Sequence, residues 1–267
     1  MTAPPTRAPR TTQRPLPPRT APAPEPGERL AKRVALLLSC SRAEAEQYIE
    51  GGFVSVDGVL EETPQRRVLN QTIEVAANAS LAKLLPVTLL LHKPPGFDAD
   101  EGRKPAAQLL TLASKFAADR SGHRTLKRHL AQQQCVTPLE TGASGLLVFS
   151  QDARIRRKLL EDAALVEHEV MVDVRGEVSP EALAYLNRTP VIDGRAMLPA
   201  RVSLSHQVDA ITGLRFAVKG CHPGQIAQMC DTVGVQVVAM KRIRVGRVPL
   251  AGLPVGQWRY LLPYERF

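Results

Sequence analysis

The sequence predicts an α+β protein with a small N-terminal domain and a larger domain built on a mixed, mainly antiparallel sheet. Two observations lead to this fold class. The composition changes at Glu28, where a proline-rich segment gives way to amphipathic helices and short strands. After Pro86, helices and strands follow one another without the strand–helix–strand repeat that is typical of a parallel sheet.

Residues 1–27 are expected to form a disordered, basic tail. They hold nine of the 22 prolines and four arginines, and almost nothing that could build a core. Such a tail can add non-specific attraction to phosphate groups, or it can be an inert extension.

The following segment predicts two helices. The first, over residues 29–38, has four apolar residues on one side: Leu30, Val34, Leu37 and Leu38. Ser39 or Ser41 can cap a second helix over residues 42–50, which has Glu44 in its first turn. Gly51 and Gly52 are expected to end this helix.

A hairpin completes the small domain. Residues 53–60 alternate like a strand that enters a tight turn at Asp57-Gly58, and residues 72–76 predict a further strand. We therefore expect a compact domain over residues 28–80, followed by a linker within residues 76–86.

This unit resembles the S4 RNA-binding domain. The resemblance lies in Arg29-Leu-Ala-Lys-Arg and in Ser41-Arg-Ala-Glu-Ala-Glu-Gln-Tyr-Ile-Glu-Gly-Gly-Phe-Val-Ser-Val-Asp-Gly. The family pattern has a helix that begins Arg-Leu, then Ser-Arg-x-x-Ala, an Ile one turn later, and a Gly-x-Val-x-Val strand. Basic side chains at neighbouring helix starts suit RNA phosphates. The candidate RNA-binding residues are Arg29, Lys32, Arg33, Ser41 and Arg42. The alternative is a small protein-interaction domain with a solvated basic face.

The larger domain, residues 86–267, is expected to contain both strands and helices. A buried strand over 87–93 ends at Lys93-Pro-Pro-Gly, and residues 106–116 predict a helix before a basic segment over 120–128. A strand over 146–149 precedes a basic helix over 152–160 and a strand over 169–174. Ser179 can start a helix over 180–186, and several strands are expected in the last third of the chain.

Charge and cysteine usage limit the classes of partner. The net charge of +9 and pI of about 9.7 favour a polyanion, with nucleic acid ahead of an anionic membrane because no basic amphipathic helix stands out. The aromatic content of 4% argues against a surface that stacks many bases in a row. The four cysteines form no C-x-x-C pair, and Cys221, His222 and Cys230 match no zinc spacing, so free thiols and no metal are expected. With no signal-like segment or membrane span, a cytoplasmic location is expected.

Three blocks carry a second resemblance. They are Leu91-His-Lys-Pro-Pro-Gly, then Val136-Thr-Pro-Leu-Glu-Thr-Gly-Ala-Ser-Gly-Leu-Leu-Val-Phe-Ser, then Gln225-Ile-Ala-Gln-Met-Cys-Asp-Thr-Val-Gly with Val238-Ala-Met-Lys-Arg-Ile-Arg-Val-Gly. In order and spacing they resemble the bacterial ribosomal RNA pseudouridine synthases of the S4-containing small- and large-subunit group. The resemblance implies a sheet-centred domain with an RNA-binding cleft. It also implies isomerisation of a flipped-out uridine by an aspartate, without cofactor or metal. Small synthases of this kind are expected to be monomers.

Glu140 occupies the position that this resemblance assigns to the catalytic aspartate. The family's Gly-Arg-Leu-Asp-x-x-x-x-Gly-Leu-Leu pattern falls without gaps on residues 137–147. Glutamate keeps the charge but moves the carboxylate outward by about 1.5 Å, the length of one carbon–carbon bond. A misplacement of about 1 Å can lower a rate on the order of a hundredfold.

Further departures cluster at the expected site. The family's arginine before the acid is Pro138, and the arginine that would pair with the acid is Ala227. The tyrosine that would stack on the target base falls on Val170, and the loop 219–224 differs in length and charge.

We therefore predict an RNA-binding member of this family that acts on ribosomal RNA and in which the isomerisation of uridine to pseudouridine is doubtful. The alternative is an active synthase that uses Glu140, and a third hypothesis is a scaffold that no longer binds RNA. Further RNA contacts are predicted at Lys93, which precedes the two prolines, and at Lys241 and Arg242, on an alternating basic strand.

Overall fold

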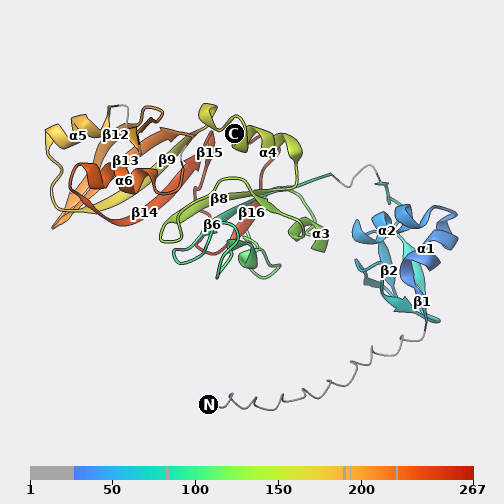
Figure 1. Cartoon of the computed structure of the whole chain (residues 1–267). Coiled ribbons are helices and arrows are strands. Elements are labelled where there is room, and N and C mark those ends of the chain that lie inside the picture. Colours follow the sequence, from blue (N-terminus) through green and yellow to red (C-terminus); the bar gives the residue numbers. More distant parts are fainter. Residues whose placement is uncertain (1–26, 82–84, 189–190, 193, 221) are drawn as a thin grey trace, which may run out of the picture.

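The computed structural model describes residues 27–81, 85–188, 191–192, 194–220 and 222–267. The predicted tail therefore lies outside the described residues, apart from Gly27. A small N-terminal unit lies beside the end of the large sheet that carries α3 (Lys127–Leu130) and α4 (Ala153–Leu160), whereas α5 (Pro180–Leu186) and α6 (Gln225–Thr232) lie at the other end (Figure 1).

The small unit contains the predicted pair of helices, α1 (Leu30–Leu38) and α2 (Arg42–Glu50). Ser41, the second of the two proposed caps, starts α2 in a reciprocal capping box with Glu44. Leu30 and Val34 are buried, but the prediction for Leu37 is wrong, because this side chain is 57% exposed. The helix ends at Leu38, and its last turn extends beyond the small core.

Short strands complete this unit. β2 (Val54–Val56) pairs with β3 (Val59–Leu60) and β5 (Ile73–Val75), and β1 (Glu28–Arg29) pairs with β4 (Arg67–Val68). Asp57 and Gly58 both have positive φ angles, 51° and 76°, as a two-residue hairpin turn requires. The turn predicted from Asp57-Gly58 is confirmed.

A nine-stranded sheet forms the large unit, in the order β12-β13-β9-β14-β8-β6-β16, with β15 on β14 and β7 on β8. Its pairs are antiparallel except for β14 with β8. The strand bounds are β6 Thr88–Lys93, β7 Gln134–Cys135, β8 Ser144–Ser150, β9 Glu167–Arg175, β12 Arg201–Val208, β13 Ile211–Lys219, β14 Gln236–Val245, β15 Val248–Pro249 and β16 Trp258–Tyr260. A separate hairpin joins β10 (Val191–Ile192) to β11 (Arg195–Ala196). The mixed, mainly antiparallel sheet is as predicted.

Cores lie on both faces of the central strands. Along β8, Leu147 and Phe149 belong to one cluster, whereas Leu146 and Val148 belong to the other. The first cluster packs against α5 and α6, and the second includes Leu159 of α4. Because successive side chains of a strand point to opposite faces, the central residues of β6 (Leu89–Leu91) and of β8 (Leu146–Phe149) are apolar without alternation.

The helix predicted over residues 106–116 is wrong. The structure has a short 3₁₀ helix, η2 (Ala106–Leu109), and a second one, η3, at Ala163–Leu165. Beyond Leu109, Thr111 and Ser114 bond to each other through side chains and backbone amides, and the Ser114 hydroxyl donates to the Leu109 carbonyl. These local bonds replace the helical ones. The predicted helices at 152–160 and 180–186 are confirmed as α4 and α5, and Ser179 caps α5.

Candidate functional site

Glu140 lies in the loop between β7 and β8, half-buried. The loop is folded back on β8, because Val136 N–H donates to Val148 O at 2.9 Å and Val148 N–H donates to the Thr137 hydroxyl at 2.8 Å. After Glu140 the chain makes a turn, which is closed by a 3.1 Å hydrogen bond from Ala143 N–H to Glu140 O. The sequence therefore presents this carboxylate on an ordered turn at the end of a buried strand.

Arg242 holds this loop from β14. Its side chain is 2% exposed, and its guanidinium donates to the carbonyls of Thr137 (2.6 Å), Pro138 (3.0 Å) and Leu146 (2.8 Å). The parallel pairing of Arg242 with Gly145 brings the two segments together. Arg242 does not lie on the surface that the basic alternation of β14 predicted, so in this structure its role is to fix the loop.

Lys93 holds the same loop from β6. It is fully buried, and its ammonium lies 2.7 Å from the carbonyls of Phe97 and Ala143 and 3.2 Å from that of Thr141. Burial lowers the pKa of Lys93 to about 8, while the carboxylates of Asp98 and Glu140 act in the opposite direction. Lys93, predicted as an RNA contact, is therefore a buried cation behind Glu140.

The Glu140 carboxylate itself contacts the start of α6. Its Oε1 accepts a 2.7 Å hydrogen bond from the N–H of Gly224, the residue that precedes this helix. Gly224 has a φ of 87°, which favours glycine. The amino end of a helix stabilises negative charge. Within the described residues, Glu140 forms no ion pair shorter than 4.0 Å, and its carboxylate accepts its hydrogen bond from a backbone amide.

The two other predicted positions are apolar. Val170 on β9 is 1% exposed and belongs to the same core cluster as Leu139 and Ala143 of the Glu140 loop. Ala227, in the first turn of α6, packs against that cluster. Neither side chain can donate a hydrogen bond or move a proton. Of the three cations of this domain that were predicted to contact RNA (Lys93, Lys241 and Arg242), only Lys241 is exposed.

The basic residues of the small unit have a different environment. Arg29, Lys32 and Arg42 are exposed on α1 and α2 or just before them. Lys32 pairs with Glu28 at 2.5 Å, and Arg33 donates to Leu69 O at 2.8 Å. Such surface pairs are weak and leave the cations able to contact phosphate. Ser41 uses its hydroxyl oxygen to cap α2, so its predicted RNA contact would need the remaining hydroxyl proton.

Sequence reasoning missed two buried histidines near the loop. His92 donates through Nδ1–H to Leu253 O at 2.7 Å, and its Nε2 is buried without a hydrogen-bond partner among the described residues. His168 on β9 is likewise buried, with Nδ1 unpartnered. In the sequence His92 has no acid beside it and His168 lies between Glu167 and Glu169, and only the fold shows that both side chains are enclosed. The described residues also contain no group of three or more His, Cys, Asp or Glu that could hold a metal ion, and no helix that could cross a membrane.

His168 predicts a pH dependence of stability. Burial, with Arg242 and Arg244, lowers its pKa to about 3 from an ordinary value of 6.5. The unfolded chain therefore binds the proton more readily, so the contribution to stability is complete above pH 6.5 and is lost as the pH falls towards 3. Between pH 7 and pH 5 we expect a loss of about 2 kcal/mol from this residue, measured by urea unfolding. His168→Leu should show a correspondingly shallower loss, and an unchanged pH dependence would contradict the assignment.

Both units of the chain resemble known proteins. The S4 domain family matches residues 28–70. SVR1 of Arabidopsis thaliana, a chloroplast protein named as a ribosomal large subunit pseudouridine synthase, is 28% identical over 83% of this chain, which spans only 55% of SVR1. Ribosomal large subunit pseudouridine synthase B of Escherichia coli K12 is 26% identical over 88% of this chain and 79% of its own length.

A solved structure supports the same fold. A crystal structure of a pseudouridylate synthase superposes with a TM-score of 0.55 at 17% identity, covering 87% of this chain and 95% of the other. At this identity the likeness shows the fold, and it agrees with the S4 match and the sequence relatives. The chain thus carries a match to the S4 domain family and, over most of its length, is similar in sequence to ribosomal large subunit pseudouridine synthases.

Proposed function

We propose that this protein binds ribosomal RNA and does not isomerise uridine at the rate of its catalytic relatives. The observation that carries the proposal is the pairing of Glu140 with a backbone N–H at 2.7 Å, while the positions of its expected arginine and tyrosine partners hold Ala227 and Val170. A carboxylate can still be charged in this setting. It lacks the side chains that would orient it against a base and remove a proton.

RNA binding is proposed to begin at the S4 domain. The exposed cations Arg29, Lys32 and Arg42 start two neighbouring helices, and this region matches the S4 family. Lys241 supplies a further exposed cation on β14. We propose the division into an S4-like domain (28–80) and a synthase-like domain (86–267), with the N-terminal segment adding non-specific attraction. We propose that this RNA binding needs no cofactor or metal, and that the protein acts as a monomer in the cytoplasm.

The RNA contact is tested by reversing one charge. Arg42→Glu is expected to weaken retention of ribosomal RNA about tenfold at low salt, because it replaces attraction to phosphate with repulsion. The measurement is filter binding or gel shift of a ribosomal RNA fragment over a salt series. Glu46→Gln, on the same helix face, removes the ion-pair partner of Arg42 and should not weaken binding. Failure of the wild-type protein to bind RNA would leave the scaffold hypothesis instead.

The catalytic state is tested by mapping pseudouridine in ribosomal RNA of cells with and without the gene. The expected result is no uridine whose modification depends on the protein. A uridine that loses its modification, and regains it with wild type but not with Glu140→Gln, would overturn the proposal.

One observation favours the second candidate, an active synthase. Glu140 is ordered by the amino end of α6, and the buried Lys93 lies close enough to sense its charge. Both place positive charge near the carboxylate in the absence of the usual arginine. The same mapping experiment decides between the two, since only the active enzyme leaves a modification that depends on Glu140.

A further inference from the structure

The C-terminal segment, residues 261–266, separates two hollows on the surface of the large domain. One, of about 480 Å³, is lined by Arg120, Arg247 and Tyr264 among others. The other, of about 410 Å³, reaches His123 and Arg154. The hollows share Leu262, Glu265 and Arg266. We call their combined lining the C-terminal arginine surface.

Its carboxylates are already neutralised within the protein. Glu265 accepts two 2.7 Å hydrogen bonds from Arg259, and both side chains of this pair are about nine-tenths buried. Asp152 pairs with Arg154 and caps α4. Five arginines face two acids across the hollows, which gives a formal charge of 5 − 2 = +3 without His123.

Three arginines carry that excess charge. Arg120 and Arg247 are exposed and form no ion pair with a described residue. Arg266 uses Nη1 on the carbonyls of Pro263 and Glu265, which leaves its other donors towards solvent. Guanidinium groups bind phosphate oxygens with two parallel hydrogen bonds, and this geometry suits a phosphodiester better than a point charge would.

An aromatic ring lies beside these cations. Tyr264 is 76% exposed and lines the first hollow together with Phe116. In a chain with 4% aromatic residues, an exposed ring next to unneutralised arginines is a specific combination. Nucleic acid can contact both features, since its bases stack on aromatic rings and its phosphates bind cations.

The surface lies away from Glu140. Leu261 N–H donates to Thr88 O at 2.9 Å, and Thr88 pairs with Ser150, the last residue of β8, whereas Glu140 precedes the first residue of that strand. Seven residues at about 3.3 Å each separate the two ends of β8 by roughly 20 Å. A ligand of this surface therefore does not occupy the Glu140 loop.

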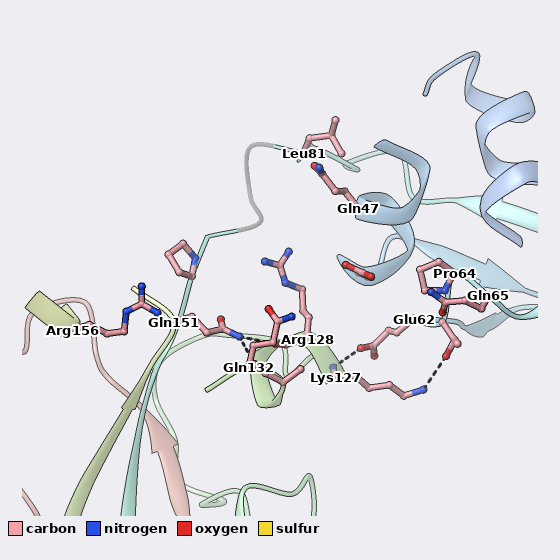
Figure 2. A pocket seen from close by; sticks show the side chains of 14 residues that line it. Gln47, Glu62, Pro64, Gln65, Leu81, Lys127, Arg128, Gln132, Gln151 and Arg156 are labelled. Atoms are coloured by element: carbon pink, nitrogen blue, oxygen red, sulfur yellow. Dashed lines mark hydrogen bonds between the residues drawn. The ribbon is translucent and has the colours of Figure 1, made fainter. Parts of the chain in front are cut away.

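The cationic lining continues towards the S4 domain. α4 contributes Arg154 to the second hollow and Arg156 to a larger groove of about 820 Å³ between α2 and the large domain. Figure 2 shows Arg128 and Arg156 projecting into this groove, with Lys127 bonded to the small domain through Glu62. A strand of RNA can thus pass from the S4 domain across α4 to Tyr264.

We propose that the C-terminal arginine surface binds the backbone of single-stranded RNA that flanks the segment held by the S4 domain, with Tyr264 stacking on a base. This inference rests on the proposed RNA-binding function. It assigns the ligand as RNA rather than an acidic protein, because an acidic peptide offers no planar base for Tyr264.

The test measures binding of a single-stranded oligouridylate to the full chain over a salt series. Arg120→Ala/Arg247→Ala is expected to reduce the slope of log K against log salt by about 1.4, two contacts at about 0.7 each. The matched control is Arg175→Ala/Arg188→Ala, which removes the same charge from exposed positions on β9 and after α5. Tyr264→Ala should weaken binding about tenfold, and Tyr185→Ala, which removes another exposed tyrosine, on α5, should not.

Equal effects of the two arginine pairs would overturn the inference, since they would show attraction by net charge alone. A second outcome would also be decisive. If Arg120→Ala/Arg247→Ala binds inorganic polyphosphate and RNA with equally reduced affinity, and Tyr264→Ala has no effect on RNA binding, the surface binds phosphate and the RNA assignment is wrong. Loss of binding in Arg42→Glu but not in the C-terminal variants would reject only this inference. Absence of RNA binding by the wild type would reject the proposed function itself.

Discussion

Gly145→Ala is expected to destabilise the large domain by about 4 kcal/mol, the sum of steric overlap and backbone strain. Gly145 has a φ of 116°, and a Cβ at this position would lie less than 3 Å from the backbone N, C and O of Arg242. These atoms belong to a paired strand, so β14 would have to move away from β8. Urea unfolding or calorimetry measures the change, and about 10 °C in Tm corresponds to it for a domain of this size.

Gly142→Ala is the matched control for this variant. Gly142 lies in the same turn, its φ is not positive, and an added Cβ would meet nothing within 4 Å. Its effect should stay within about 0.5 kcal/mol. If the two alanine variants unfold alike, β8 and β14 do not approach each other as closely as this structure shows, and the position of the Glu140 loop would need revision.

Features decided by neighbouring residues were predictable from the sequence. Ser41 and Ser179 cap helices, and Asp57-Gly58 forms a turn, because each uses hydrogen bonds or φ angles within a few residues. The position of Glu140 was likewise predictable, since Gly145 and the following leucines fix the register of the resemblance.

Features decided by long-range packing were not predictable in the same way. Alternation along residues 241–244 indicates a basic face but not whether another segment covers it. The parallel pairing of β14 with β8 buries Arg242 beneath a loop about a hundred residues earlier. Lys93 is buried for the same reason, by carbonyls of the loop before β8. Gly224 could be singled out only as a glycine, because its bond to Glu140 joins residues 84 positions apart.

Arg242→Met is expected to cost about 4 kcal/mol, because it leaves the carbonyls of Thr137, Pro138 and Leu146 without their charged donor in a buried site. The Glu140 loop should also open locally. A protease that cleaves after glutamate reports this opening, through faster cleavage at Glu140 under native conditions. Arg242→Lys keeps the charge, but a single ammonium replaces the planar guanidinium. We therefore expect this variant to recover only part of the stability that Arg242→Met loses.

Arg244→Met separates this effect from a general loss of charge on β14. Arg244 lies two residues further along, its side chain is 25% exposed, and it pairs with Glu167 and Glu169 at the surface of the sheet. Because these pairs are only partly buried and do not hold the Glu140 loop, the cost should be smaller, about 2 kcal/mol, with no faster cleavage at Glu140. Equal costs and equal cleavage in the two variants would contradict a specific role for Arg242. A selective effect would show that a buried cation fixes the loop on which either candidate function of Glu140 depends.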